Sequence, residues 1–441
     1  ESYVSLGIWP DPDLAGTGLQ TNGGHTLVVL PLKEDMTLPA VVKRFDLELK
    51  DFKQEAFAKI PYLEESHSGT AMAILNQKLL ITNTAQAMQS TLSHYAKHEK
   101  NVYDEPGNQR YLSELPWFRQ GTFILNNAVY TRKALTKTGQ IGSKIAGMGD
   151  ILPLTVGAIQ AQPDQRVALR FITPVQLQSI PDVALRKSLQ AIVQPIAAFP
   201  QAIQLPQNTG LMVGLTHPET VYDFYHDFMI PPENARWAQM LQMLLSSFHL
   251  DFRKDVVGLL SQRTVIASRF EQQPSLMVVT DKNDAKDKSL DKISTLLSTN
   301  AFPIKLEKGQ LGELSFKTLS LPGSRPNSQL QYGTVGTNLV FATPQDFTAI
   351  VKVTRHEEKS LAETPIYYTT MGGLPNQANA MLYLNVQAQA NTQHLPGGLQ
   401  NPGQWLEAVG VALWLTPQPK GNAVLNGQLN LKLANPKKQA G

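Results

Sequence analysis

The sequence predicts an α+β protein made of two tandem copies of one unit, each a mainly antiparallel sheet with helices packed on one face. Two observations lead to this prediction. Apolar runs and turn signals between Ser2 and Phe171 recur in the same order between Thr264 and Leu433. Strand-like runs also follow one another directly instead of alternating strictly with helices, which argues against a doubly wound parallel sheet.

The second copy gives the most complete series of elements. A short apolar strand over 210–216 precedes a helical pattern over 218–249, which breaks at Pro231 and Pro232. The elements expected after it are strands over 264–268 and 275–280, a polar turn over 281–288, a helix over 290–297, a strand pair through 313–319, a hairpin over 330–342, a helix over 344–353, and strands over 380–385, 408–416 and 423–433.

The first copy repeats this order. Tyr111–Pro116 and Ser360–Pro365 share Leu, Glu and Pro at equivalent places, and the runs ending at Asn126 and Asn385 both end in Leu-Asn. The remaining matches pair 3–8 with 265–270, 26–30 with 275–279, 38–45 with 290–297, 71–81 with 330–341, 85–95 with 345–353, 154–159 with 407–412, and 166–172 with 427–433. Such matches in a conserved order predict an internal repeat.

The repeat sets the expected domains. We expect a first domain over 1–200, which includes a linking helix in 174–199, and a second, complete domain over 201–441. The stretch 205–263 has no counterpart ahead of Glu1, so the first copy is expected to lack about 60 residues that include a strand and a helix. We expect the linking segment to take the place of that helical layer.

Composition narrows the function classes. The 39 basic and 36 acidic side chains are scattered and give a net charge of +3, so no nucleic-acid partner is expected. The chain has no cysteine, which excludes thiolate catalysis and Cys-ligated metal centres and suits an oxidising extracytoplasmic space. No apolar run of about 18 residues predicts a membrane-spanning helix. The chain begins with Glu1 instead of Met, so the question of a targeting segment stays open.

One histidine pair has the spacing of a metal site. His94 and His98 are four residues apart on a predicted helix, so both rings would lie on one face. A metalloprotease helix would carry Glu beside the first histidine, where this chain has Tyr95. An exposed helix face with two neutral histidines is the favoured interpretation, and a metal site is the alternative.

Two acidic segments invite a chemical role. Asp281–Asp287 has alternating carboxylates, but Ala285 and Lys286 occupy the positions where a calcium loop needs an oxygen ligand and Gly. A charged strand-to-helix turn is the favoured interpretation. Glu65 and His67 would share one side of a strand end, where ordinary surface polarity is favoured over an acid–base pair. We therefore predict no catalytic residue, no cofactor and no metal site.

Several segments of the second copy carry a resemblance to a known family. They are the opening Pro206–Gly214, the Asp251–Leu260 stretch, the Tyr332–Ala342 hairpin, and Ser360–Pro365 with the later Leu-Tyr-Leu-Asn385 run. The chain resembles bacterial proteins, abundant in cyanobacteria, that share the domain of unknown function 3352. The resemblance implies a secreted or membrane-anchored extracytoplasmic protein, and it carries over no catalytic residue.

These observations together predict a non-catalytic extracytoplasmic scaffold or interaction protein with a protein partner in a membrane complex. In a cyanobacterium the compartment would be the periplasm or the thylakoid lumen, and the partner a photosynthetic or envelope complex. Membrane association would come through a segment that residues 1–441 lack. One alternative is a carrier that binds an apolar or small ligand between the two domains. Another is an undescribed hydrolase that uses His67 or the pair His94 and His98.

Overall fold

The computed structural model describes residues 4–10, 24–32, 35–45, 47–97, 106–126, 151–180, 183–192, 197–224, 240, 242–243, 245–247, 249–270, 275–298, 304–321, 323, 329–392, 405–419 and 422–434. The chain divides into two compact units: unit 1 is Glu1–Ala161 with Leu169–Ser179, and unit 2 is Gln162–Ala168 with Ile180–Gly441. The segment that the sequence groups with the first copy contains α6 (Val183–Ile192), which packs against α7 (Pro218–Phe224) within unit 2.

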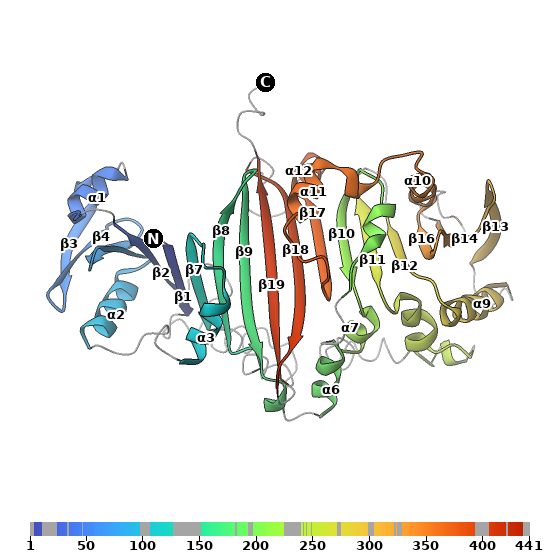
Figure 1. Cartoon of the computed structure of the whole chain (residues 1–441), viewed down its shortest axis with the longest axis horizontal. Helices are drawn as coiled ribbons and strands as arrows, with labels where there is room; N and C mark the ends of the chain where they lie inside the picture. The colour runs from blue at the N-terminus through green and yellow to red at the C-terminus, as the bar shows by residue number, and fades with distance from the viewer. Residues whose placement is uncertain are drawn as a thin grey trace, which may run out of the picture. The chain divides into compact units, whose positions relative to one another are not determined.

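Unit 2 contains one sheet in which every neighbouring pair of strands is antiparallel (Figure 1). The strands lie in the order β13 (Lys305–Leu311), β14 (Leu314–Ser320), β15 (Leu330–Val335), β16 (Asn338–Ala342), β12 (Met277–Asp281), β11 (Thr264–Arg269), β10 (Thr209–Leu215), β17 (Ala380–Asn385), β18 (Leu406–Pro417) and β19 (Ala423–Leu433).

Unit 1 has a sheet of related order. Its strands are β3 (Phe52–Phe57), β4 (Ile60–Glu65), β5 (Ala71–Leu75), β6 (Lys78–Thr82), β2 (Gly24–Pro31), β1 (Val4–Pro10), β7 (Gly121–Asn126) and β8 (Leu154–Gln162). β1 and β7 are parallel, and the other pairs are antiparallel. β9 (Arg166–Val175) follows β8 through a turn in which Asp164 and Gln165 have positive φ. The predicted α+β class with mainly antiparallel sheets is confirmed.

Corresponding strand pairs of the two units have the same register, so the predicted repeat is visible in how the strands pair. β2 and β6 pair from Leu27 opposite Thr82, and β12 and β16 pair from Met277 opposite Ala342. The hairpins β5–β6 and β15–β16 each close through a two-residue turn, as the registers show. The hairpins β3–β4 and β13–β14 do so as well. Each of the strands β2 to β6 of unit 1 therefore has a defined counterpart in unit 2.

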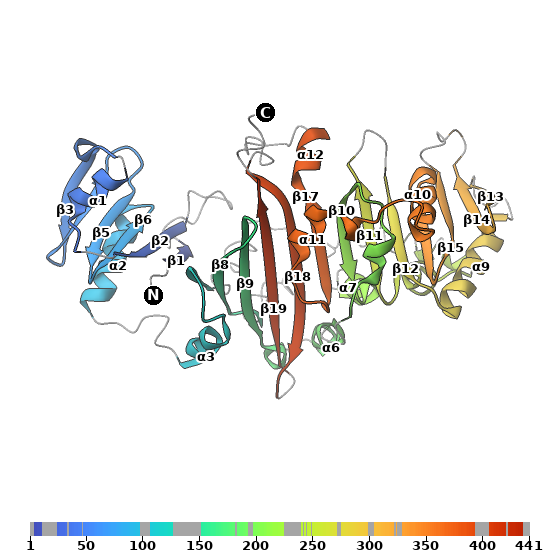
Figure 2. The same ribbon diagram turned by 45° about the horizontal axis from the view of Figure 1, so that its top comes forward.

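Helices lie on both faces of the unit 2 sheet. Along β16, Leu339 and Phe341 belong to the core that contains α9 (Asp284–Ser298), whereas Val340 and Ala342 belong to the core that contains α10 (Pro344–Thr354) (Figure 2). Successive strand residues point to opposite faces, so the two helices cover opposite sides. The sequence places the helices on one face, because helical periodicity shows which residues are buried but not which side of the sheet buries them.

Unit 1 repeats this arrangement with helices of different length. α1 (Leu38–Arg44) buries Val41 against Met72 and Leu79, and α2 (Ala85–Ala96) buries its apolar residues on the other face. α1 has 7 residues, whereas its counterpart α9 has 15. The sequence predicts helices of equal length here, over 38–45 and 290–297. The structure confirms the first helix and starts the second six residues earlier, within the predicted polar turn.

The other helical elements connect the strands. In the predicted helix over 218–249, α7 covers the start, and 225–239 lie outside the described residues. Among the described residues no helix is long and apolar enough to cross a membrane. The remaining elements are η2 (Leu49–Asp51), α3 (Pro106–Glu114), η3 (Leu177–Ser179), η4 (Pro200–Gln204), η6 (Phe252–Val256), η7 (Val257–Leu260), η9 (Leu361–Glu363), α11 (Pro365–Met371) and α12 (Val386–Thr392).

Candidate functional site

The histidine pair is only half described. His94 lies near the end of α2 and is exposed, whereas His98 lies outside the described residues. Within the described part of the chain no group of three His, Asp or Glu side chains is placed to hold a metal ion. The predicted preference for an exposed helix face agrees with the exposure of His94, and the metal alternative stays a prediction.

Glu65 and His67 do come together, as the strand geometry predicts. His67 Nδ1 lies 3.1 Å from Glu65 Oε1, but the imidazole is 84% exposed. The carboxylate also accepts hydrogen bonds from the Ser68 backbone N–H at 2.5 Å and the His67 backbone N–H at 3.0 Å. Hydrogen bonds from Ser68, with those from His67, lower the pKa of Glu65 to about 2. The carboxylate stabilises the turn between β4 and β5.

Asp281–Asp287 forms the end of β12 and the first turn of α9, as the turn interpretation predicts. Asn283 caps the helix, because its Oδ1 accepts a hydrogen bond of 3.0 Å from the backbone N–H of Lys286. Lys286 is 1% exposed, and its ammonium donates to Ser261 O at 2.6 Å, Thr280 Oγ1 at 2.6 Å and Asp281 O at 2.7 Å. The buried ammonium of Lys286 therefore binds the Asp281 carbonyl oxygen within this segment.

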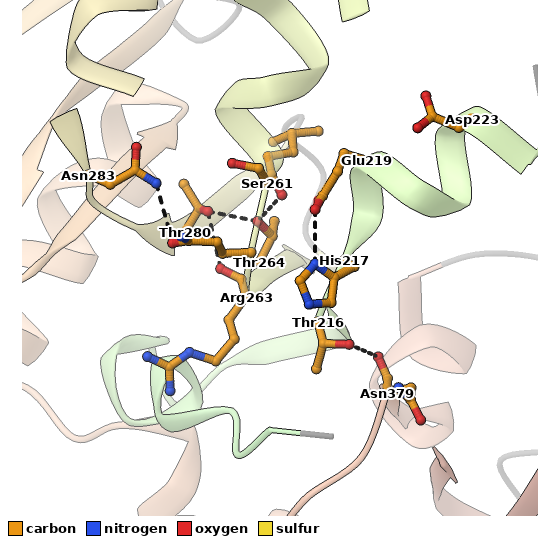
Figure 3. A network of polar contacts seen from close by, with 12 residues as sticks. Thr216, His217, Glu219, Asp223, Ser261, Arg263, Thr264, Thr280, Asn283 and Asn379 are labelled. Carbon is orange, nitrogen blue, oxygen red and sulfur yellow. Dashed lines mark hydrogen bonds and ion pairs between the residues drawn. The ribbon is translucent and has the colours of Figure 1, made fainter. Parts of the chain in front are cut away.

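Lys286 donates to Thr280, one of the polar residues that Figure 3 shows near the ends of β11 and β12. Thr264 Oγ1 lies 2.7 Å from Thr280 Oγ1, and Arg263 Nε donates to Asp281 Oδ2 at 2.7 Å. Nearby, His217 Nδ1 lies 2.9 Å from Glu219 Oε1. The hydrogen bonds of Lys286, Thr264 and Arg263 form a network that joins the ends of β11 and β12 to α9.

One property of Lys286, its lowered pKa, is also found in catalytic lysines. Burial lowers the pKa of Lys286 to about 8, although Asp281 and Glu219 act in the opposite direction. A lysine with a lowered pKa is a candidate nucleophile. All three ammonium protons of Lys286 are nevertheless engaged with oxygen acceptors, and the side chain is buried. Its geometry is that of a fixed structural cation.

Unit 1 contains an apolar cavity over the face of β3, β4 and β5 that α1 covers in part. Its volume is about 540 Å³, and Leu49 in its lining is 48% exposed. Of its lining residues only Thr37 and Gln54 are polar. We call this cavity the apolar groove; its lining is Met36, Thr37, Leu38, Pro39, Leu49, Phe52, Gln54, Pro61, Leu63 and Ile74.

The corresponding face of unit 2 is covered by its own helix. Leu290 and Ile293 of α9 pack against residues of β13, β14 and β15, the counterparts of β3, β4 and β5. The Ser294 hydroxyl of α9 also lies 2.8 Å from the Tyr332 hydroxyl and accepts a hydrogen bond of 3.0 Å from Lys317 Nζ. The longer helix thus fills in unit 2 a place that the shorter α1 leaves open in unit 1.

Exposed apolar side chains precede one groove residue, Leu49, in the sequence. Phe45 and Leu47, in the segment that joins α1 to η2, are 50% and 44% exposed, and they precede Leu49. Three large apolar side chains within five positions are thus about half exposed. Sequence reasoning missed this site because it predicted equal helices over 38–45 and 290–297 and so no uncovered sheet face.

Comparison with curated proteins and with solved structures gives no match to this chain. A family described as "Protein of unknown function (DUF3352)" matches residues 24–431, a range that spans elements of both units from β2 to β19. The match covers nearly the whole chain, so the resemblance expected from the second copy extends through the first. The protein is a member of the DUF3352 family.

Proposed function

We propose that the protein is a non-catalytic interaction protein whose unit 1 binds an amphipathic helix of a partner protein in the apolar groove. One observation supports the proposal most directly: the groove opens over β3, β4 and β5, and the counterpart strands of unit 2 carry α9 on that same face. A sheet face that one copy covers with its own helix is shaped to receive a helix in the other copy.

The packing of α9 suggests what such a partner presents. Leu290, Ile293 and Leu297 are spaced as one apolar face of a helix, and Leu290 and Leu297 are buried. The lining of the apolar groove contains no charged side chain. A helix with apolar residues at positions i, i+3 and i+7 therefore fits the groove, because burial of apolar area would supply most of the binding free energy.

We place this interaction outside the cytoplasm and propose that it attaches the protein to a membrane complex. The lack of cysteine in all 441 residues supports an oxidising compartment, and the resemblance described above supports a secreted or anchored protein. We propose a cyanobacterial source, the periplasm or the thylakoid lumen as the compartment, and a membrane complex as the partner.

A carrier function is the second candidate. The volume of the apolar groove, about 540 Å³, lies within the range of small-molecule sites, about 300–1,000 Å³. The apolar ligand would then be held within unit 1. The expectation of a ligand between the two domains remains a separate prediction.

A peptide with the α9 sequence, Asp284–Ser298, tests the helix proposal. We expect the labelled peptide to bind the full chain in a fluorescence anisotropy titration, and Leu49→Glu to weaken binding at least about tenfold. Leu321→Glu is the matched control, since Leu321 is an exposed leucine of unit 2 and should leave binding unchanged. Absence of binding at about 100 μM, or equal effects of the two substitutions, would contradict the proposal.

Native mass spectrometry separates the two candidates. If the protein is a carrier, the purified chain should retain an apolar small molecule that Leu49→Glu releases and Leu321→Glu does not. The α9 peptide should then compete with that molecule. A ligand-free chain that binds the peptide favours the interaction protein.

A further inference from the structure

In unit 1, β1 pairs directly with β7, whereas one more strand separates the counterparts of these two strands in unit 2. The β1–β7 ladder joins Val4 to Gly121 and proceeds without a shift to Ile8 opposite Leu125. In unit 2, β10 lies between the two counterparts of these strands, β11 and β17. No strand among the described residues of unit 1 separates β1 from β7.

The correspondence extends to individual residues. Gly214 of β10 faces Val265 of β11 on one side and Met381 of β17 on the other. The counterparts of these two neighbours are Ser5, which pairs with Val29 as Val265 pairs with Val279, and Thr122, since the runs from Thr122 and Met381 end in the same Leu-Asn.

Ser5 and Thr122 face each other directly in unit 1. At every described position of the β1–β7 ladder, the two residues that pair are the counterparts of the β11 and β17 residues that face one β10 residue. Unit 1 therefore has the sheet of unit 2 with one strand removed and the register kept.

We propose that the seam between β1 and β7 is a strand-insertion site, which takes an extended, uncharged, apolar peptide segment of a partner protein antiparallel to both strands. Insertion would replace one parallel ladder with two antiparallel ladders, which gives more backbone hydrogen bonds and a slightly more stable pairing per residue. It would also give unit 1 the strand directions of unit 2.

The connectivity of unit 1 allows the seam to open. β1 to β6 are all drawn from residues 4–82, and β7 and β8 from residues 121–162. Only the stretch between β6 and β7 joins the two blocks along the chain, so they can separate by one strand spacing, about 4.8 Å, without breaking another ladder of unit 1.

The seam also restricts the inserted sequence. Residues 4–8 and 121–125 contain no charged side chain, and β10 in unit 2 has none either. A charged residue in the inserted strand would be taken from water without a partner, which is costly. The segment should therefore have the uncharged apolar character of Thr209–Leu215.

A peptide with the sequence Gln207–Thr216 tests the insertion. We expect it to bind the full chain and to slow amide hydrogen exchange at residues 4–8 and 121–125, with exchange in β10, β11 and β17 unchanged. A peptide with Met212→Pro, which lacks a central N–H donor, should bind at least about tenfold more weakly. Protection confined to unit 2 would overturn the proposal, and so would dimers of the peptide-free chain that the peptide dissociates, since the occupant would then be a second copy.

A disulfide across the seam gives an independent test, because the chain has no other cysteine. In the double variant Ser5→Cys and Thr122→Cys the two residues face each other in the ladder, so oxidation should lock the seam. We expect the oxidised variant to lose peptide binding and the reduced variant to recover it. Equal binding in both redox states would place the peptide elsewhere and overturn the proposal.

Discussion

Leu63 of β4 faces Met72 of β5 in the same register in which Lys317 of β14 faces Tyr332 of β15. The four residues occupy equivalent places beneath α1 and α9. In unit 2 the pair is polar, and both members contact Ser294 of α9. In unit 1 the pair is apolar, and Leu63 lines the apolar groove. This cross-strand pair is thus one difference between the two sheet faces.

The polar pair should contribute to the docking of α9. Lys317→Met removes the hydrogen bond to Ser294 and the ammonium 5.8 Å from the centre of the Tyr332 ring. We expect the free energy of unfolding to fall by about 1–2 kcal/mol and exchange of the α9 amides to accelerate. Lys308→Met is the control, because Lys308 is exposed and faces Lys317 across the ladder, and its effect should stay within about 0.5 kcal/mol. Equal effects would mean that Lys317 does not hold α9.

The stability of the fold should depend strongly on the buried carboxylate of Asp346. It is fully buried at the start of α10 and accepts from Arg269 at 2.6 Å, Thr343 Oγ1 at 2.5 Å and Leu276 N at 3.1 Å. Asp346→Asn leaves the Arg269 cation buried without its counter-charge, so we expect a loss of about 3–5 kcal/mol in urea denaturation.

A partly exposed ion pair supplies the comparison. Asp223 accepts two hydrogen bonds from Arg253, at 3.0 and 2.6 Å, but the Arg253 side chain is half exposed. Asp223→Asn should cost less than about 1 kcal/mol, because water screens the pair. Similar losses for Asp346→Asn and Asp223→Asn would show that burial does not decide the effect.

The sequence predicted the repeat because hairpins and strand ends leave local signals. Apolar runs separated by turn residues located β5–β6 and β15–β16, and the shared Leu-Asn endings aligned Asn126 with Asn385 correctly. Ladder register is less local. The predicted alignment of 3–8 with 265–270 is two residues off, since the ladders align Ser5 with Val265. Apolar strands tolerate such a shift in a sequence comparison because both faces are buried.

The sites depend on contacts that no local pattern contains. The first turn of α9 is rich in Asp and Lys, so the sequence predicted a turn, and only Asn283 as a cap marked the helix start. The burial of Lys286 could not be predicted from the sequence, because lysine is rarely buried. Two of its three hydrogen-bond acceptors are backbone carbonyls, which leave no sequence signal. The apolar groove results from the difference in length between two helices, which becomes visible only when α9 is placed on its sheet.

The turn that Glu65 stabilises should weaken in acid. The folded-state pKa of about 2 lies below the ordinary value of 4.5, so the carboxylate contributes stability above pH 4.5 that is lost as the pH falls towards 2. We expect the free energy of unfolding of the wild type to decrease more than that of Glu65→Gln across this window. Glu64→Gln, at the neighbouring position of β4, should keep the wild-type slope. Parallel curves for wild type and Glu65→Gln would contradict the role of the carboxylate.

Burial of Lys286 should make stability rise in mild alkali. Burial lowers its folded-state pKa to about 8 from 10.5, so between these values the unfolded chain binds more protons and the free energy of unfolding increases with pH. Lys286→Met removes this titration, so the wild type should gain on the variant from pH 8 to 10.5 and show a constant difference below pH 8. Lys282→Met, in a partly exposed pair with Asp287 at the same turn, should retain the wild-type slope. A difference between wild type and Lys286→Met that shrinks with pH would mean that the three hydrogen bonds outweigh burial and raise the pKa instead.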